Sequence, residues 1–78
     1  MDEIFLNWLK LRVLNCKIPS PQSLKSILDR EACGMCTFEV TPEWVIKVYD
    51  ESSFIKSYFL KVQNSIVKSV EAGLSADK

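Results

Sequence analysis

The fold is decided by one stretch of the sequence, Thr37-Phe38-Glu39-Val40-Thr41-Pro42-Glu43-Trp44-Val45-Ile46-Lys47-Val48-Tyr49. Residues 44–49 have the apolar spacing of a helix that begins at the cap Thr41-Pro42-Glu43. The same residues are rich in β-formers, so 37–40 could instead pair with them across a Thr-Pro-Glu turn. That turn contains no Gly or Asn to supply a positive φ, which a tight hairpin favours. The sequence therefore favours the helix.

The segment that follows has the clearest helical period in the chain. Its apolar residues recur at a 4-3-4-4 spacing, in the order Ile55, Phe59, Val62, Ile66 and Val70. Ser52 or Ser53 can cap its start, and Gly73 suits its end. We predict an amphipathic helix of about 20 residues here. If Asp50–Ser53 is also helical, this helix and the preceding one form a single rod.

The residues before the decisive stretch predict two further helices. In the first, from Asp2 to about Cys16, the apolar positions are Phe5, Leu6, Leu9 and Val13, with Trp8, Leu11 and Leu14 widening the stripe. So wide a stripe indicates a helix covered on more than one side. Pro19 and Pro21 end it. Ser20-Pro21 then starts a short second helix that ends near Ala32.

The length of 78 residues predicts a single small domain. The segments above make its fold mainly α, a small bundle of three to four helices over residues 1–74. Residues 75–78 form a disordered polar tail in this prediction. The alternative is an α+β fold with a short hairpin at about 36–49 between helices.

The composition excludes several classes of chemistry. Ten basic residues balance ten acidic ones, and there is no His. Without His there is no Ser-His or Cys-His pair and no His-containing metal site. The chain also lacks a Gly-rich phosphate loop and a nucleophile elbow. We therefore predict that it is not an enzyme and has no catalytic residues, cofactor or small-molecule substrate.

The three cysteines, Cys16, Cys33 and Cys36, are an odd number, which argues against a disulfide framework. The start of the chain lacks the positive charge of a signal peptide, and no apolar run approaches the roughly 18 residues of a membrane span. We predict a cytoplasmic protein with no membrane span. The Cys33-Gly34-Met35-Cys36 spacing supplies only half of a zinc site, so no metal is predicted, although two copies in a homodimer could build a four-cysteine site.

Charge and apolar content both predict a contact with another protein. Residues 29–51 carry a net charge of −4, and the segments on either side carry +2 each. Eight aromatic residues and twenty-one Ile, Leu and Val residues exceed what so small a domain can hide. We predict a small adaptor, regulator or chaperone-like subunit that binds a protein partner or self-associates as a homo-oligomer. The predicted contact residues are Ile55, Phe59, Val62 and Ile66 of the last helix, with Trp8 and Trp44 as anchors.

The second functional hypothesis is a DNA-binding transcriptional regulator of the helix-turn-helix type. Its recognition helix would be Gln22–Arg30 or Glu43–Tyr49. The chain contains only two Arg and has no net positive charge. Counterion release would then contribute little to affinity, so the sequence favours protein over nucleic acid as the partner.

Overall fold

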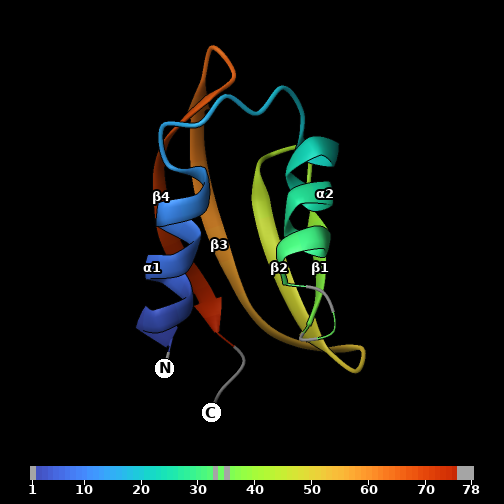
Figure 1. Ribbon diagram of the computed structural model, residues 1–78. Helices are drawn as coiled ribbons and strands as arrows, with labels where there is room; N and C mark the ends of the chain where they lie inside the picture. Colours follow the sequence, from blue (N-terminus) through green and yellow to red (C-terminus); the bar gives the residue numbers. More distant parts are fainter. Residues whose placement is uncertain (1, 33, 35, 76–78) are drawn as a thin grey trace.

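Two helices are followed along the chain by four strands in the computed structural model, which describes residues 2–32, 34 and 36–75. The elements are α1 (Asp2–Val13), α2 (Pro21–Glu31), β1 (Thr37–Val40), β2 (Val45–Asp50), β3 (Ser53–Gln63) and β4 (Ile66–Ser75). The strands form one antiparallel sheet in the order β1-β2-β3-β4. Both helices lie on the same face of this sheet and run in opposite directions (Figure 1).

The predicted bundle of three to four helices is wrong beyond the second helix. α1 and α2 lie close to where the sequence placed them, and Ser20 caps α2 through its side chain, with Pro21 as the first helical residue. From Thr37 to Ser75, however, the chain forms a sheet. The hairpin set aside as the alternative is present at 37–50, but it is the first half of a four-stranded sheet and does not lie between helices.

The turn between β1 and β2 shows why the argument against a hairpin failed. Trp44 itself adopts a positive φ of 65°, although bulky residues rarely do so. Thr41 holds this conformation: its carbonyl accepts from the Trp44 amide at 2.9 Å, and its hydroxyl accepts from the Val45 amide at 3.2 Å. Such a turn followed by one left-handed residue is a common hairpin connection. The threonine hydrogen bonds therefore stabilise the backbone that Gly or Asn would adopt readily.

Two further turns divide the segment predicted as the last helix. Glu51 and Ser52 have φ values of 51° and 72°, and Asn64 and Ser65 have 53° and 66°. Pairs of positive φ between strands are typical of two-residue type I′ hairpin turns. β3 between these turns alternates, with Tyr58 and Leu60 buried and Phe59 and Lys61 exposed. Side-chain burial in this part of β3 therefore repeats every two residues, as in a strand, although the apolar residues also have the spacing of a helix.

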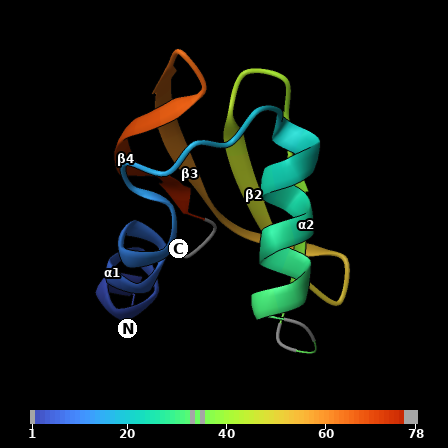
Figure 2. The ribbon, with the colours of Figure 1, turned by 45° about the horizontal axis from the view of Figure 1, so that its top comes forward.

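The core lies between the helices and the face of the sheet that they cover. Its buried apolar residues are Leu9, Val13, Ile18, Leu24, Leu28, Ala32, Phe38, Ile46, Val48, Tyr58, Leu60, Val67 and Val70. α1 packs against β4, and α2 packs against β1, so each helix covers one half of the same sheet face (Figure 2). The opposite face of the sheet has no helix over it among the described residues.

The segment between the helices protects one edge of the sheet. After α1, Asn15 takes a left-handed φ of 65°, a usual helix ending. The Asn15 amide then donates to the Val67 carbonyl at 2.8 Å, and the Val67 amide donates to the Cys16 carbonyl at 3.1 Å. These bonds cover the start of β4, which would otherwise be an open edge. β4 ends at Ser75, and residues 76–78 of the predicted tail lie outside the described residues.

Candidate functional site

A cavity lies between the two helices, above the first strand of the sheet. In the described part of the chain, the backbones of α1 and α2 contact the sheet but do not contact each other. The space between them has a volume of about 360 Å³. Its lining consists of Ile4, Phe5 and Trp8 from α1, Glu31 and Ala32 from the end of α2, and Cys36 and Phe38 from β1 and the residue before it. We call this space the interhelical groove.

Aromatic rings form the inner wall of the interhelical groove. The Phe5 ring lies 5.4 Å from Trp8 and 6.1 Å from Phe38, measured between ring centroids. It also lies 5.4 Å from the buried ring of Tyr58, and the Lys56 ammonium sits 5.1 Å above it. Aromatic pairs at these separations are attractive beyond the area they bury. The wall is therefore a packed cluster that can hold its shape when a ligand enters.

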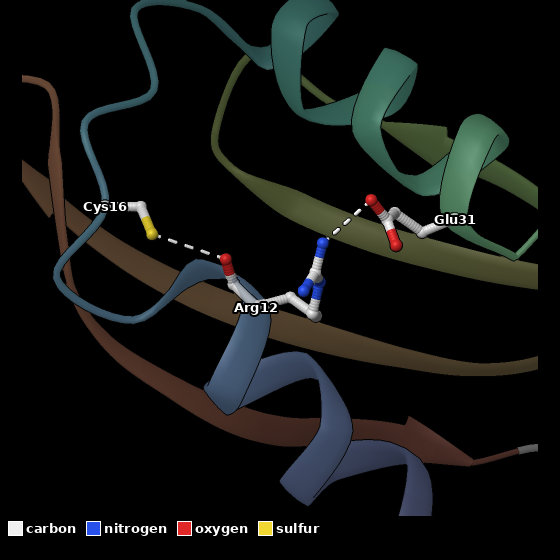
Figure 3. A network of polar contacts seen from close by, with 3 residues as sticks. All are labelled: Arg12, Cys16 and Glu31. Carbon is white, nitrogen blue, oxygen red and sulfur yellow. Dashed lines mark hydrogen bonds and ion pairs between the residues drawn. The ribbon is translucent and has the colours of Figure 1, made fainter.

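One ion pair links the two helices across the groove. Arg12 Nη2 of α1 donates to Glu31 Oε2 of α2 at 2.8 Å (Figure 3). Both side chains are substantially exposed, and pairs of this kind contribute at most about 1 kcal/mol. The Cys16 thiol donates to the Arg12 carbonyl at 3.3 Å, beyond the end of α1. Because the exposed Arg12–Glu31 ion pair contributes so little, it can open at little cost when a ligand binds.

Two exposed apolar side chains extend the groove along the top of α1. Ile4 is 69% exposed and Leu11 is 84% exposed. They are seven positions apart in the sequence, with the groove residue Trp8 between them, so the three lie on one side of the helix. We call Ile4, Trp8 and Leu11 the α1 ridge. Ile4 and Trp8 also line the cavity, so the ridge adjoins it, and adjoining exposed apolar side chains are a mark of interaction sites.

Of the predicted contact residues, only Trp8 belongs to this surface. Ile55 and Val62 are half-buried and pack against the core, and Ile66 begins β4. Phe59 is 45% exposed, but by strand alternation it lies on the face of the sheet without helices. The structure therefore does not bring the four predicted β3 and β4 residues together as one contact face.

The other predicted anchor, Trp44, lies in the turn between β1 and β2. It is half-buried, and its carbonyl accepts from the Leu60 amide at 3.1 Å. The backbone of Trp44 thus helps to join β2 to β3. Trp44 is not among the residues that line the groove.

Apart from Trp8, the residues of the candidate site were not predicted as contact residues, and these include the exposed Ile4 and Leu11. A signal for them existed, because the apolar stripe of α1 is wider than one packed face requires. The wide stripe led us to expect cover on more than one side. Instead, within the described residues the sheet covers only one side, and Leu11 remains exposed.

The fold places a net positive charge on one half of the domain and a net negative charge on the other. α1, β3 and β4, with residues 2–20 and 52–75, contain six basic and three acidic residues, a net charge of +3. α2, β1 and β2, with residues 21–51, contain three basic and six acidic residues, a net charge of −3. The two basic ends of the chain come together because α1 lies over β4. The interhelical groove runs along the boundary between the two halves.

The remaining titratable residues of interest lie away from the groove or outside the described residues. Tyr49 donates to Glu39 Oε1 at 3.1 Å on the uncovered side of the sheet. Desolvation, the hydrogen bond and the charge of Glu39 raise the pKa of Tyr49 above 10.0. Cys33 lies outside the described residues, so the four-cysteine site that two copies of the Cys33–Cys36 motif could build falls outside them as well. Among residues 2–32, 34 and 36–75, no group of three or more potential metal ligands is clustered.

Comparisons with known proteins identify no relative of this chain. No protein-family model matches the sequence, and neither a curated protein nor a solved structure is significantly similar to it. Neither helix in the described part of the chain has the length and apolar character needed to cross a membrane. The candidate site therefore rests on the residues and geometry of this chain.

Proposed function

We propose that this protein is a small protein–protein interaction module whose contact surface is the interhelical groove with the α1 ridge. The observation that carries the proposal is the apolar cavity of about 360 Å³ beside exposed Ile4 and Leu11. Aromatic side chains in a recessed, apolar site are typical of the residues that dominate binding energy at protein interfaces. The module would act as an adaptor, regulator or chaperone-like subunit by holding a partner's apolar residues there.

The shape of the surface favours a protein segment over a small molecule. A small ligand would fill the cavity but would leave Leu11, which is 84% exposed and does not line the cavity, in contact with water. An amphipathic helix could place apolar residues both in the cavity and against the α1 ridge. The polar groups at the mouth are few, and the carboxylate of Glu31 is held by Arg12. A groove with so few polar groups at its mouth suits the binding of a partner's apolar side chains.

The free thiols of Cys16 and Cys36 support placing this module in the reducing cytoplasm. The earlier DNA-binding hypothesis loses one of its two recognition helices, because Glu43–Tyr49 is a turn and a strand. The other candidate, Gln22–Arg30, lies within α2, whose apolar side packs on the sheet. No observation in the structure favours that function over protein binding.

Site-specific capture tests the proposal. A photo-crosslinking residue, p-benzoylphenylalanine, replaces Leu11 in one variant of the full chain and Leu74 in a second. Leu74 is the matched control, because it is a leucine on β4 that is 70% exposed and does not line the groove. In the native cell, we expect a protein adduct at position 11 that is absent at position 74. Equal capture at both positions, or no capture at position 11, would contradict the proposal.

A further inference from the structure

The described residues that line the interhelical groove combine three aromatic rings with one charged group. The rings belong to Phe5, Trp8 and Phe38, and the charged group is the carboxylate of Glu31. Aromatic rings attract cations through their faces, and a carboxylate attracts them through its charge. Taken alone, these four residues would therefore favour a cationic occupant.

Two cations of the chain itself already contact these groups. Arg12 Nη2 reaches across from α1 and donates to Glu31 Oε2 at 2.8 Å (Figure 3). Lys56 Nζ lies 5.1 Å from the centroid of the Phe5 ring. A cationic occupant would have to share Glu31 with Arg12, and it would also meet the positive charge of Lys56. An uncharged occupant would disturb neither contact.

We infer that Arg12 sets the specificity of the interhelical groove, because its pairing with Glu31 makes the groove select an uncharged side chain over a cationic one. The inference rests on the proposed function and specifies the chemistry of the partner residue that enters the cavity. Arg12 is not among the residues that line the cavity, so it acts through Glu31 and not by contact with the occupant. Its backbone carbonyl accepts from the Cys16 thiol, a bond that replacement of the Arg12 side chain leaves in place.

The exposure of the ion pair limits the size of the effect. Both side chains are partly open to water, where solvent screens their attraction. Removing the positive charge of Arg12 should therefore change the relative affinity of the groove for a cation by about fivefold.

Two small probes of similar shape measure this preference on the purified full chain. Benzyl alcohol is uncharged and benzylammonium is a cation, and the single ring of either fits a cavity of about 360 Å³. The methyl resonances of Ile4 and Ala32, which both line the cavity, report binding by NMR at physiological ionic strength. We expect the unmodified chain to bind benzyl alcohol more tightly than benzylammonium. Arg12→Gln should shift the ratio of the two dissociation constants toward benzylammonium by about fivefold.

Three further variants separate the charge of Arg12 from a structural role. Arg12→Lys keeps the charge and should keep the original ratio. Glu31→Gln combined with Arg12→Gln should abolish the shift, because no carboxylate is then left to attract the cation. Lys25→Gln is the matched control: it removes the same charge from an ion pair on α2, with Asp29 at 2.7 Å, and neither residue lines the groove. Circular dichroism verifies that each variant keeps the native fold.

Failure of this inference is distinguishable from failure of the proposed function. The inference is overturned if the unmodified chain prefers benzylammonium, if Arg12→Gln leaves the ratio unchanged, or if Lys25→Gln shifts it equally. It is also overturned if neither probe moves the Ile4 and Ala32 resonances in any variant. Capture of a partner protein at position 11 in the cell would still support the proposed function in each of these cases.

Discussion

Replacing Gly73 with alanine is a sharp test of the sheet, because a methyl group there would meet two residues of the neighbouring strand. A Cβ atom built on Gly73 lies 2.7 Å from Ser57 Oγ and 3.0 Å from Phe59 Cζ. Ser57 Oγ also accepts a hydrogen bond from the Leu74 amide at 2.9 Å. This bond lies where β3 and β4 shift register between Lys56 and Tyr58. The substitution therefore disturbs packing and a hydrogen bond at one irregular point in the sheet.

The expected cost follows from three effects. Overpacking typically costs about 1–3 kcal/mol, and the value here lies at the low end because Phe59 is 45% exposed and can turn away. If Ser57 rotates, the lost Leu74 hydrogen bond costs about 0.5–1.5 kcal/mol. Against these, replacing Gly with Ala restricts the unfolded chain and stabilises the protein by about 0.4–1 kcal/mol. We therefore expect Gly73→Ala to lower the free energy of unfolding by about 1 kcal/mol.

Urea and thermal unfolding followed by circular dichroism measure this change, and a loss of about 1 kcal/mol lowers Tm by about 4–8 °C in a domain of this size. The decisive measurement is the double-mutant cycle with Ser57→Ala. In the sheet the two residues touch, so the double variant should lose less than the sum of the single losses, by about 0.5 kcal/mol or more. In one continuous helix they would be about 24 Å apart and their effects would add. Additive losses would refute the strand pairing.

Three further predictions concern a turn, a buried hydroxyl and a surface hydrogen bond. Ser52→Gly should stabilise the protein by about 0.5 kcal/mol in urea unfolding, because Ser52 has a φ of 72° that strains any residue with a side chain; a loss of stability would contradict the type I′ turn. Tyr58→Phe should stabilise it by about 1 kcal/mol, because the buried Tyr58 hydroxyl has no hydrogen-bond partner among the described residues; a destabilised variant would reveal a hydrogen bond. Tyr49 should titrate above 10.0, measured by phenolate absorbance in Tyr58→Phe, and Glu39→Gln should lower that pKa. The folded state holds the Tyr49 proton more tightly than the unfolded chain does. The protonated Tyr49 therefore contributes its full stabilisation below pH 10, and this stabilisation is lost as the pH rises through the raised pKa. A Tyr49 pKa that Glu39→Gln leaves unchanged would contradict the hydrogen bond between Tyr49 and Glu39.

The helical part of the fold was predictable because its signals are local. Ser20 and Pro21 specify the start of α2 through a side-chain cap and a fixed φ, which need no distant contact. The strands were not predictable in this way. Ile55, Phe59, Val62 and Ile66 have helical spacing by coincidence, since the exposed Phe59 and half-buried Ile55 lie on strand β3 and Ile66 follows a turn. The helical spacing of these four residues concealed the period of two that the buried Tyr58 and Leu60 follow along β3.

The candidate site was only partly visible in the sequence. Trp8 was predicted as an anchor and lines the groove, because a large aromatic residue in a wide apolar stripe is conspicuous. Leu11 was expected to be covered and Ile4 was not placed in the apolar stripe, because a helical wheel cannot show where the sheet ends. Cys36 and Phe38 reach the groove only through the placement of β1 beside α2. Their contribution depends on contacts between residues far apart in the chain.

By itself, the sequence determined where the two helices lie, showed that the chain has no His, and indicated an apolar content in excess of what a small core can bury. These follow from counts and from interactions within a few residues. Only the tertiary structure decided that residues 37–75 form a sheet, because Thr41 holds Trp44 in a left-handed turn and neighbouring strands supply the hydrogen bonds. Tertiary structure also brought two basic ends of the chain together and left the α1 ridge beside a groove. Neighbours across space, rather than along the chain, chose which apolar residues remained exposed.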